Sequence, residues 1–277
     1  MRAAVLGSPV GHSLSPALHR AAYAELGLDD WSYEAIECGE ARLPGLIGSL
    51  GPDWAGLSLT MPLKRAVIGL LDRVTPLAEQ VGAVNTVVFG TAEKGDRVLH
   101  GYNTDVGGMT DALAAAGAAP ASALIIGGGA TACSALAALR DIGLRKATVA
   151  VRAAGRAGDL LAAADRLGIA VELTDVDWPG YRGGAPGGLV ISTVPAGAAD
   201  QLAGRIHRLA PATVLDVVYD PWPTRLAVAA REQDAAVIGG FELLLYQAAR
   251  QVRLMTGLEP PVEAMRAAGL GALGQRS

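Results

Sequence analysis

Two short polar clusters in the first half of the chain contain side chains that can transfer protons. The first runs from Thr60 to Lys64 and includes a proline, and the second is Asn103-Thr104-Asp105. A lysine and a carboxylate can act as a proton carrier and its partner in general acid–base catalysis. Taken alone, the first cluster also has an ordinary interpretation, since Pro62 could simply open a helix and Lys64 could be a solvated cation in its first turn.

A glycine-rich segment follows these clusters and matches the fingerprint of dinucleotide-binding sites, G-x-G-x-x-G/A. Gly127 permits a tight turn, Gly129 lets the backbone approach a pyrophosphate, and Ala132 lets helix and strand pack closely. A plain tight turn would show the same glycines. Here an apolar strand candidate precedes them and a helix candidate follows, so we predict that the helix N-terminus binds the pyrophosphate.

The residue that ends the next strand candidate indicates which dinucleotide binds. NAD enzymes usually carry Asp or Glu there, roughly 20 residues past the glycines, to bind the ribose hydroxyls. This chain carries Arg152 instead, with Arg156 one turn further on. Guanidinium groups offer planar, charge-assisted donors that suit the 2′-phosphate of NADP. Two solvated surface arginines would look the same, but the absence of an acid favours NADP(H).

The elements that must position these residues fall into two series. In the first, strand candidates lie at residues 3–6, 31–36, 56–59, 85–89 and 97–100, and helix candidates at 16–26 and 105–116. The last two strands flank a polar link and are predicted to form a hairpin. In the second series, strands at 123–126, 148–151, 189–193, 214–218 and 236–238 alternate with Ala/Leu-rich helical stretches, and a helix at 241–257 follows. Such alternation predicts a parallel sheet covered on both faces.

Composition narrows the functional classes. The 277 residues are 51% apolar and carry a formal net charge of −4, which gives no reason to expect nucleic acid or an anionic membrane as a partner. Two distant cysteines indicate a reducing compartment, and four scattered histidines lack metal-ligand spacing, so we expect no metal. With no signal-peptide pattern and no apolar run of roughly 20 residues, we expect a soluble, cytoplasmic protein.

Several motifs, in this order along the chain, resemble those of the shikimate dehydrogenase family. They are G-x-P-x-x-H-S-x-S-P from Gly7, T-x-P-x-K from Thr60, G-A-x-N-T at 82–86, N-T-D-x-x-G at 103–108, the glycine-rich turn, D-V-V-Y at 216–219 and Gln247. The resemblance extends over nearly the whole chain. It implies NADPH-dependent, reversible reduction of 3-dehydroshikimate to shikimate, a step of aromatic amino-acid (chorismate) biosynthesis.

The resemblance also implies roles for the matching positions. Lys64 and Asp105 would be the catalytic pair. Ser13 and Ser15 would bind the substrate carboxylate. The substrate hydroxyls would be bound by Thr60, Asn85 and Gln247, with Tyr219 nearby. The cofactor-binding residues would be Gly127, Gly128, Gly129, Ala130, Thr131, Arg152, Arg156, Thr193, Val217 and Gly240.

The chemistry of such a reaction supports this pair on independent grounds. Hydride transfer between a nicotinamide and a ring carbon requires a proton to move on the attached oxygen. An ordinary lysine, with a pKa of about 10.4, is too basic to do this well at neutral pH unless burial favours its neutral form. We therefore interpret Lys64 as the proton carrier and Asp105 as the residue that orients it and the substrate hydroxyl. One departure from the family pattern is Ser58, where Asn is common.

These observations together predict an α/β protein with an N-terminal α/β substrate domain and a Rossmann-type, doubly wound NADP-binding domain. We expect the first to comprise residues 1–106, completed by C-terminal helices at 240–277, and the second residues 107–239. The protein is expected to be a monomer or a homodimer that acts on a small-molecule substrate. Two alternatives stay open: a quinate/shikimate or aminoshikimate dehydrogenase paralogue, and a non-catalytic NADP-binding regulator.

Overall fold

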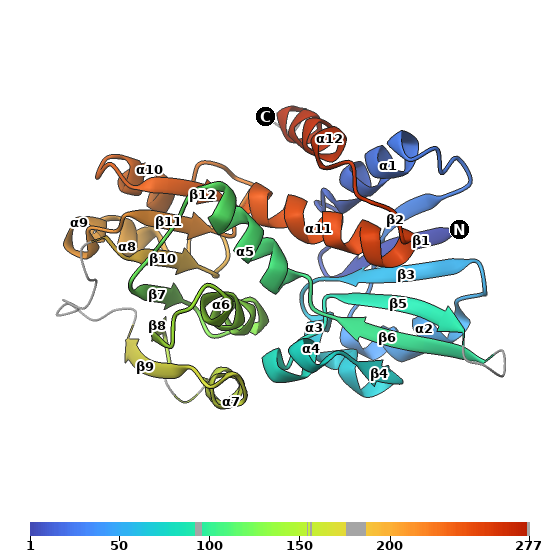
Figure 1. Ribbon diagram of the computed structural model, residues 1–277, viewed down its shortest axis with the longest axis horizontal. Coiled ribbons are helices and arrows are strands. Elements are labelled where there is room, and N and C mark those ends of the chain that lie inside the picture. Colours follow the sequence, from blue (N-terminus) through green and yellow to red (C-terminus); the bar gives the residue numbers. More distant parts are fainter. Residues whose placement is uncertain (92–95, 154, 156, 176–186, 276–277) are drawn as a thin grey trace. The chain divides into compact units, whose positions relative to one another are not determined.

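The computed structural model describes residues 1–91, 96–153, 155, 157–175 and 187–275 of the chain. The chain divides into two compact units (Figure 1). The first comprises Met1–Thr104 and Leu245–Ser277, and the second comprises Asp105–Leu244. Each unit is built around a six-stranded sheet.

The sheet of the first unit is mixed. Its strands are β1 (Arg2–Gly7), β2 (Ser32–Glu37), β3 (Trp54–Leu59), β4 (Arg73–Val74), β5 (Thr86–Thr91) and β6 (Arg97–Tyr102), arranged in the order β2-β1-β3-β5-β6-β4. β1 pairs in parallel with both β2 and β3, whereas β5 runs antiparallel to β3 and β6. The predicted hairpin of the two later strands is confirmed by the β5–β6 pairing.

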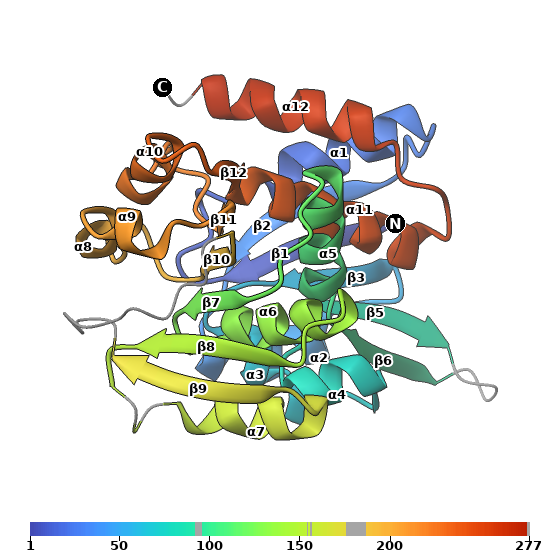
Figure 2. The same ribbon diagram turned by 60° about the vertical axis from the view of Figure 1, so that its left-hand side comes forward.

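Both faces of this sheet are covered by helices, because alternate residues of its central strands are apolar and point to opposite faces. Ala3 and Val5 belong to a core with Tyr23 of α1 (Ser15–Glu25) and Met255 of α11 (Gly240–Thr256). Ala4 and Leu6 belong to a second core, whose helical members come from α2 (Leu43–Ser49), α3 (Leu63–Ala66) and α4 (Pro76–Val81). The C-terminal helix α12 (Val262–Gly274) packs against α1 (Figure 2).

The sheet of the second unit is entirely parallel. Its strands are β7 (Ala123–Ile126), β8 (Lys146–Val151), β9 (Ala170–Asp175), β10 (Leu189–Ser192), β11 (Thr213–Asp216) and β12 (Ala236–Gly239). They are arranged in the order β12-β11-β10-β7-β8-β9. Numbered within the unit this is the 3-2-1-4-5-6 order of the Rossmann fold, whose ligand site lies where the strand order reverses, here between β7 and β10. The predicted doubly wound fold is therefore confirmed.

The helices of this unit are α5 (Asp105–Ala115), α6 (Ala130–Asp141), α7 (Gly158–Leu167), α8 (Asp200–Ala203), α9 (Ile206–Leu209) and α10 (Arg225–Arg231). Leu124 and Ile126 of β7 lie in one core with Ile206 and Leu226, so α9 and α10 cover that face. α6 is buried continuously from Ala132 to Leu139. A helix that is apolar on all sides is an interior element, and this one directly follows the glycine-rich turn.

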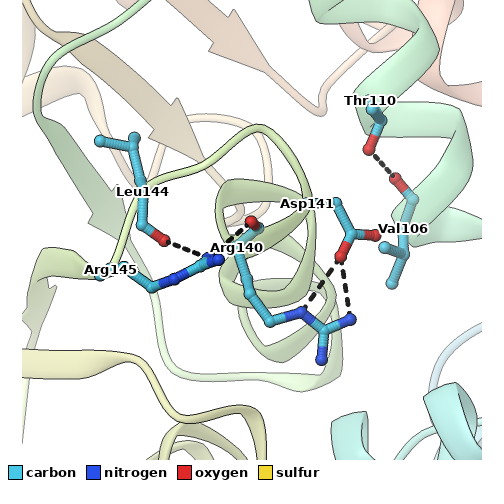
Figure 3. Close-up of polar contacts among 6 residues, drawn as sticks. All are labelled: Val106, Thr110, Arg140, Asp141, Leu144 and Arg145. Carbon is cyan, nitrogen blue, oxygen red and sulfur yellow. Dashed lines mark hydrogen bonds and ion pairs between the residues drawn. The ribbon is translucent and has the colours of Figure 1, made fainter.

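Arginine side chains bind the C-terminal end of α6 (Figure 3). The guanidinium of Arg145 donates through Nη1 to the carbonyl oxygen of Arg140 at 2.9 Å and to that of Leu144 at 3.4 Å. Arg140 binds the carboxylate of Asp141 through Nε and Nη2, at 3.1 and 2.9 Å. Cations near the last carbonyls of a helix are favoured by its dipole, so these contacts stabilise the helix whose other end faces the nucleotide turn.

Candidate active site

The loop that carries Thr60 and leads to Lys64 lies beside the end of β1. The Thr60 amide donates to the carbonyl of Leu6 at 2.9 Å, and the Ser8 amide donates to the carbonyl of Met61 at 2.9 Å. Gly7 makes this approach possible, because a Cβ atom there would lie 2.3 Å from Cγ2 of Thr60. The loop of the first serine motif and the loop of the lysine motif therefore run side by side.

Backbone hydrogen bonds attach Lys64 to the segment that carries Asn85. The carbonyl of Lys64, a partly buried residue of α3, accepts from the Val84 amide at 2.8 Å. The Leu59 amide donates to the carbonyl of Asn85 at 2.8 Å, just before the Thr60 loop. Three residues that the sequence predicted for one site, Thr60, Lys64 and Asn85, are thus held on neighbouring segments of the first unit.

The buried amide of Asn85 is the centre of a polar cluster. Its Oδ1 accepts from the Thr104 amide at 2.8 Å and from the Thr86 hydroxyl at 2.9 Å. Its Nδ2 donates to Oγ1 of Thr104 at 2.9 Å and to Oε1 of Gln247 at 3.3 Å. The structure therefore brings Asn85 and Gln247 together, although 162 positions separate them in the chain.

The two predicted carboxylate-binding serines lie at the beginning of α1. Oγ of Ser13 accepts from the Ser15 amide at 3.2 Å, and the carbonyl of Ser15 accepts from Nδ1 of His19 at 2.9 Å. Ser15 is buried and Ser13 is partly buried. These contacts hold the backbone around both hydroxyl-bearing residues.

Asp105 is the first residue of α5, and its side chain is only 5% exposed. A carboxylate in the first turn of a helix is stabilised by the dipole and by the unpaired amides there. It directly follows Thr104, which binds Asn85. Because Lys64 belongs to the first unit and Asp105 to the second, their pairing stays a prediction.

The glycine-rich turn joins β7 to α6 at the point where the strand order reverses. Gly127 has a φ of +112°, which disfavours residues with a side chain, and its amide donates to the carbonyl of Ala150 at 2.9 Å. A Cβ atom there would lie 2.5 Å from Oγ1 of Thr193. That hydroxyl donates to the carbonyl of Ile126 at 2.8 Å, so Thr193 joins the end of β10 to the end of β7.

The N-terminus of α6 has the features of an anion site. Gly129 is the residue that precedes the helix, and none of the described side chains caps it. A Cβ atom on Gly129 would meet nothing within 4 Å, whereas one on Gly128 would lie 3.2 Å from Cγ1 of Val151. Open space therefore lies in front of the first amides of the helix, where Ala130 and Thr131 form its first turn. These unpaired donors and the helix dipole suit a pyrophosphate.

Arg152 directly follows β8 and its side chain is exposed. The strand it follows is the neighbour of β7, so Arg152 lies at the edge of the sheet that carries the glycine-rich turn. Arg156, the second predicted arginine, lies outside the described residues.

The segment after β11 contains two predicted cofactor residues and the predicted tyrosine. The amide of Val217 donates to the carbonyl of Ser192 at 3.0 Å, and that of Gly240 donates to the carbonyl of Val218 at 3.1 Å. A Cβ atom on Gly240 would lie 2.0 Å from the carbonyl oxygen of Val217, so only glycine allows α11 to begin this close to the segment. Tyr219 is partly buried there.

A set of buried polar residues to which the sequence analysis assigned no role lies next to Asn85. Gln251 lies one turn after Gln247 on α11, and the i, i+4 spacing of two glutamines on one helix is the signal that could have indicated it. Ser58 and Tyr33 continue the set through hydrogen bonds. Within the described ranges, no group of three or more His, Cys, Asp or Glu side chains could hold a metal ion, and no helix has the length and apolar character needed to cross a membrane.

Comparison with known proteins identifies the family. Residues 5–87 match the shikimate dehydrogenase substrate binding domain, and residues 240–268 match the shikimate 5'-dehydrogenase C-terminal domain. The shikimate dehydrogenase (NADP(+)) of Methanosarcina mazei is 37% identical over 288 residues, which cover 97% of each chain.

Solved structures match this chain over nearly its whole length. The crystal structure of Mycobacterium tuberculosis shikimate dehydrogenase is 40% identical and superposes with a TM-score of 0.86, covering 98% of this chain and 99% of that chain. Shikimate 5-dehydrogenase from Thermus thermophilus, in complex with NADP(H) and shikimate, is 35% identical with a TM-score of 0.83 and the same coverage. The chain therefore belongs to the shikimate dehydrogenase family.

Proposed function

We propose that this chain catalyses the NADP(H)-dependent, reversible reduction of 3-dehydroshikimate to shikimate, a step of aromatic amino-acid biosynthesis. One observation carries the proposal: the chain aligns over 98% of its length with a relative solved in complex with NADP(H) and shikimate. The chain also has a lysine, a carboxylate and a glycine-rich turn of the types that the reaction requires. A regulator that only binds NADP would not need the first two.

The first unit supplies the residues that bind substrate. Ser13 and Ser15 donate to the substrate carboxylate from the beginning of α1. Thr60, Asn85 and Gln247 bind its hydroxyls, and Tyr219 of the second unit is assigned to the substrate as well. The hydrogen bonds that join Asn85 to Gln247 support a shared role for this pair. A site of fixed hydroxyl and amide donors is well suited to select a polyhydroxylated acid.

The second unit supplies the residues that bind NADP(H). The glycine-rich turn and the first turn of α6, with Gly127, Gly128, Gly129, Ala130 and Thr131, receive the pyrophosphate. Arg152 and Arg156 receive the 2′-phosphate, and Thr193, Val217 and Gly240 complete the set. The open space at Gly129 and the absence of a capping side chain among the described residues fit this assignment. Thr193 and Gly240 also have structural roles, because they hold β10 and α11 close to neighbouring backbone.

Lys64 and Asp105 carry out the proton transfer to and from the substrate oxygen. When bound, the nicotinamide supplies the hydride for reduction. The Lys64 ammonium gives a proton to the substrate oxygen in that direction and recovers it in the reverse direction. Asp105, at the N-terminus of α5, accepts a hydrogen bond and orients the lysine and the substrate hydroxyl. Proton transfer by a positioned group contributes about 10²–10⁴-fold to such a rate.

A spectrophotometric assay tests the proposed activity. The full chain is expected to reduce NADP⁺ in the presence of shikimate, with absorbance of NADPH as the measurement. Parallel reactions with quinate and with NAD⁺ distinguish the paralogues. Absence of turnover, with NADP⁺ binding retained, would contradict the proposal and favour a regulator.

Replacing Arg152 with aspartate is expected to lower the ratio of kcat/KM for NADP⁺ to that for NAD⁺ by about tenfold or more. The change removes a donor to the 2′-phosphate and adds a like charge next to it, and a hydrogen bond between charged groups contributes about 1.5–3 kcal/mol. The measurement is initial-rate kinetics with each cofactor.

A matched control is Lys146→Asp, which makes the same charge change at the opposite end of the same strand. Lys146 forms an exposed ion pair with Glu172 at 3.1 Å, and such pairs contribute little to stability. The control should leave the cofactor ratio unchanged. An unchanged ratio in Arg152→Asp as well would mean that this arginine does not read the 2′-phosphate.

A further inference from the structure

A continuous chain of buried hydrogen bonds crosses the first unit from β2 to β5. The Tyr33 hydroxyl donates to Oγ of Ser58 at 2.6 Å, and Ser58 donates to Oε1 of Gln251 at 2.8 Å. Gln251 then donates through Nε2 to Oγ1 of Thr86 at 3.0 Å, and Thr86 donates to Oδ1 of Asn85 at 2.9 Å. The hydroxyls of Ser58 and Thr86 each accept one hydrogen bond of this chain and donate the next.

The donor-to-acceptor direction of these hydrogen bonds determines how the Asn85 amide is oriented. Oδ1 of Asn85 receives both the Thr86 hydroxyl and the Thr104 amide, so the oxygen must lie on that side. The Nδ2 group is therefore turned to Thr104 Oγ1 and to Oε1 of Gln247. Because Gln247 accepts through its oxygen, its own amide orientation follows from that of Asn85. The two predicted hydroxyl-binding amides are thus oriented as a pair.

The other end of the chain reaches the serine motif. The ring of Tyr33 stacks on that of His19, with centroids 3.9 Å apart and planes 17° from parallel. Nδ1 of His19 donates to the carbonyl of Ser15 at 2.9 Å. Burial raises the pKa of the Tyr33 hydroxyl, and hydrogen bonds with the Ser58 and Ser15 side chains oppose this only in part. Tyr33 therefore remains a neutral donor at the start of the chain.

Gln251 is the link that supplies both an acceptor and a donor at one buried position. It is 1% exposed, and its terminal carboxamide accepts from Ser58 through Oε1 and donates to Thr86 through Nε2. A carboxylate has no donor for Thr86, and leucine has neither group. Buried amides that lose a partner carry a penalty, so this position demands an amide of this length.

We propose that Gln251 is a positioning residue for substrate: through Thr86 it orients the Asn85–Gln247 amide pair, and through Ser58 and Tyr33 it connects that pair to the Ser15 segment. The inference rests on the proposed function, since it assigns Asn85, Gln247 and Ser15 to shikimate. Gln251 itself need not touch the substrate. Its effect on catalysis is transmitted by the four other side chains of the hydrogen-bond chain, Tyr33, Ser58, Thr86 and Asn85.

The test compares Gln251→Leu, Ser58→Ala and Tyr33→Phe with the wild-type chain. We expect the shikimate KM to rise by about tenfold or more in Gln251→Leu, which corresponds to about one lost hydrogen bond in binding. The rise should be smaller in Ser58→Ala and smallest in Tyr33→Phe, because these residues lie further from Asn85 along the chain. The KM for NADP⁺ should stay within about twofold of wild type, and kcat should change less than the shikimate KM.

Melting temperature and a second variant of α11 separate positioning from simple destabilisation. Thr256→Val removes a hydroxyl that donates to the carbonyl of Val252 at 2.7 Å, on the same helix but outside the hydrogen-bond chain. It should leave the shikimate KM unchanged even if it lowers the melting temperature. If Gln251→Leu does not fold, Ser58→Ala decides the question. An unchanged shikimate KM in the folded variants, or equal rises for shikimate and NADP⁺, would overturn the inference.

Calorimetric titration with shikimate separates this inference from the proposed activity. A wild-type chain that binds shikimate without oxidising it would overturn the activity, and the Kd values of the variants would then decide the inference. A wild-type chain that does not bind shikimate would overturn both.

Discussion

Replacing Lys64 with alanine is expected to lower kcat for shikimate oxidation by about 10²–10⁴-fold, the contribution of a positioned proton-transfer group. The substrate hydroxyl must lose its proton as hydride leaves the same carbon, and the variant has no base at that atom. Substrate binding should change less, because Ser13, Ser15, Asn85 and Gln247 are retained. Steady-state rates over a range of shikimate concentrations, with NADP⁺ saturating, give kcat and KM separately.

Lys64→Arg adds a second arm to this experiment. Arginine keeps the positive charge but does not give up its proton, so it should restore little of the lost kcat. Lys146→Ala, at an exposed lysine of the second unit, is the control and should behave like wild type. A loss that appears mainly in KM, or full rescue by arginine, would mean that Lys64 binds substrate by its charge and does not carry the proton.

Most elements could be predicted from local patterns, because alternating apolar residues and glycines act at short range. The predicted helix at 105–116 ends one residue early, at Ala115, and Gly117 follows with a φ of +66°. The predicted strand at 214–218 is shorter in the structure and ends at Asp216. The Asp216 side chain accepts from the Val218 amide at 3.3 Å, and this local contact competes with the strand.

Several short or peripheral elements were not predicted, and for β9 the physical reason can be named. β9 (Ala170–Asp175) is an edge strand with no buried residue, so it lacks the apolar pattern of the inner strands. α12 (Val262–Gly274) lies within the C-terminal helices predicted at 240–277, although it contains three glycines, including Gly269 and Gly271, and residues of this kind weaken a helix by about 1 kcal/mol each. Its packing against α1 favours the helix, and tertiary contacts of this kind cannot be read from local propensity.

The candidate site shows the same difference between local patterns and long-range contacts. Its motif residues could be predicted because each belongs to a short pattern. Gln251 and Ser58 could not, because their hydrogen bond joins positions 193 residues apart, and Tyr33 joins Ser58 over 25 residues. The i, i+4 spacing of Gln247 and Gln251 is a local signal, but it does not indicate the hydrogen bond between Gln251 and Ser58. Their significance emerges only when β3 and α11 pack together in the first unit.

Lowering the pH from 6.5 to about 4 is expected to reduce the free energy of unfolding by about 3 kcal/mol through His19 alone. This side chain is fully buried, and burial lowers its pKa from the ordinary 6.5 to about 4, while the hydrogen bond to the Ser15 carbonyl opposes the shift. Because a carbonyl can only accept, Nδ1 carries the proton. Nε2 is buried without a partner among the described residues, so a proton there would have no acceptor.

The sign of this change in the free energy of unfolding follows from proton binding. Between pH 6.5 and about 4 the unfolded chain binds a proton at His19 that the folded chain does not bind, so acid favours unfolding. The contribution of His19 to the free energy of unfolding is fully present above pH 6.5, falls between pH 6.5 and about 4, and levels off at lower pH. The interval from 6.5 to about 4, at 1.36 kcal/mol for each pKa unit, corresponds to about 3 kcal/mol.

Urea unfolding of wild type and His19→Phe between pH 7 and pH 4 measures this effect, because phenylalanine retains the stacking on Tyr33 and cannot titrate. The variant should be less stable at neutral pH, where it lacks the bond to Ser15, but should lose less stability in acid. Asp216, whose pKa burial raises above 3.8, acts in the opposite sense and cancels in the difference between the two proteins. His207→Asn, at an exposed histidine, should keep the wild-type slope. If His19→Phe kept that slope too, the acid sensitivity would have to come from another group, and the buried imidazole would be a packing residue only.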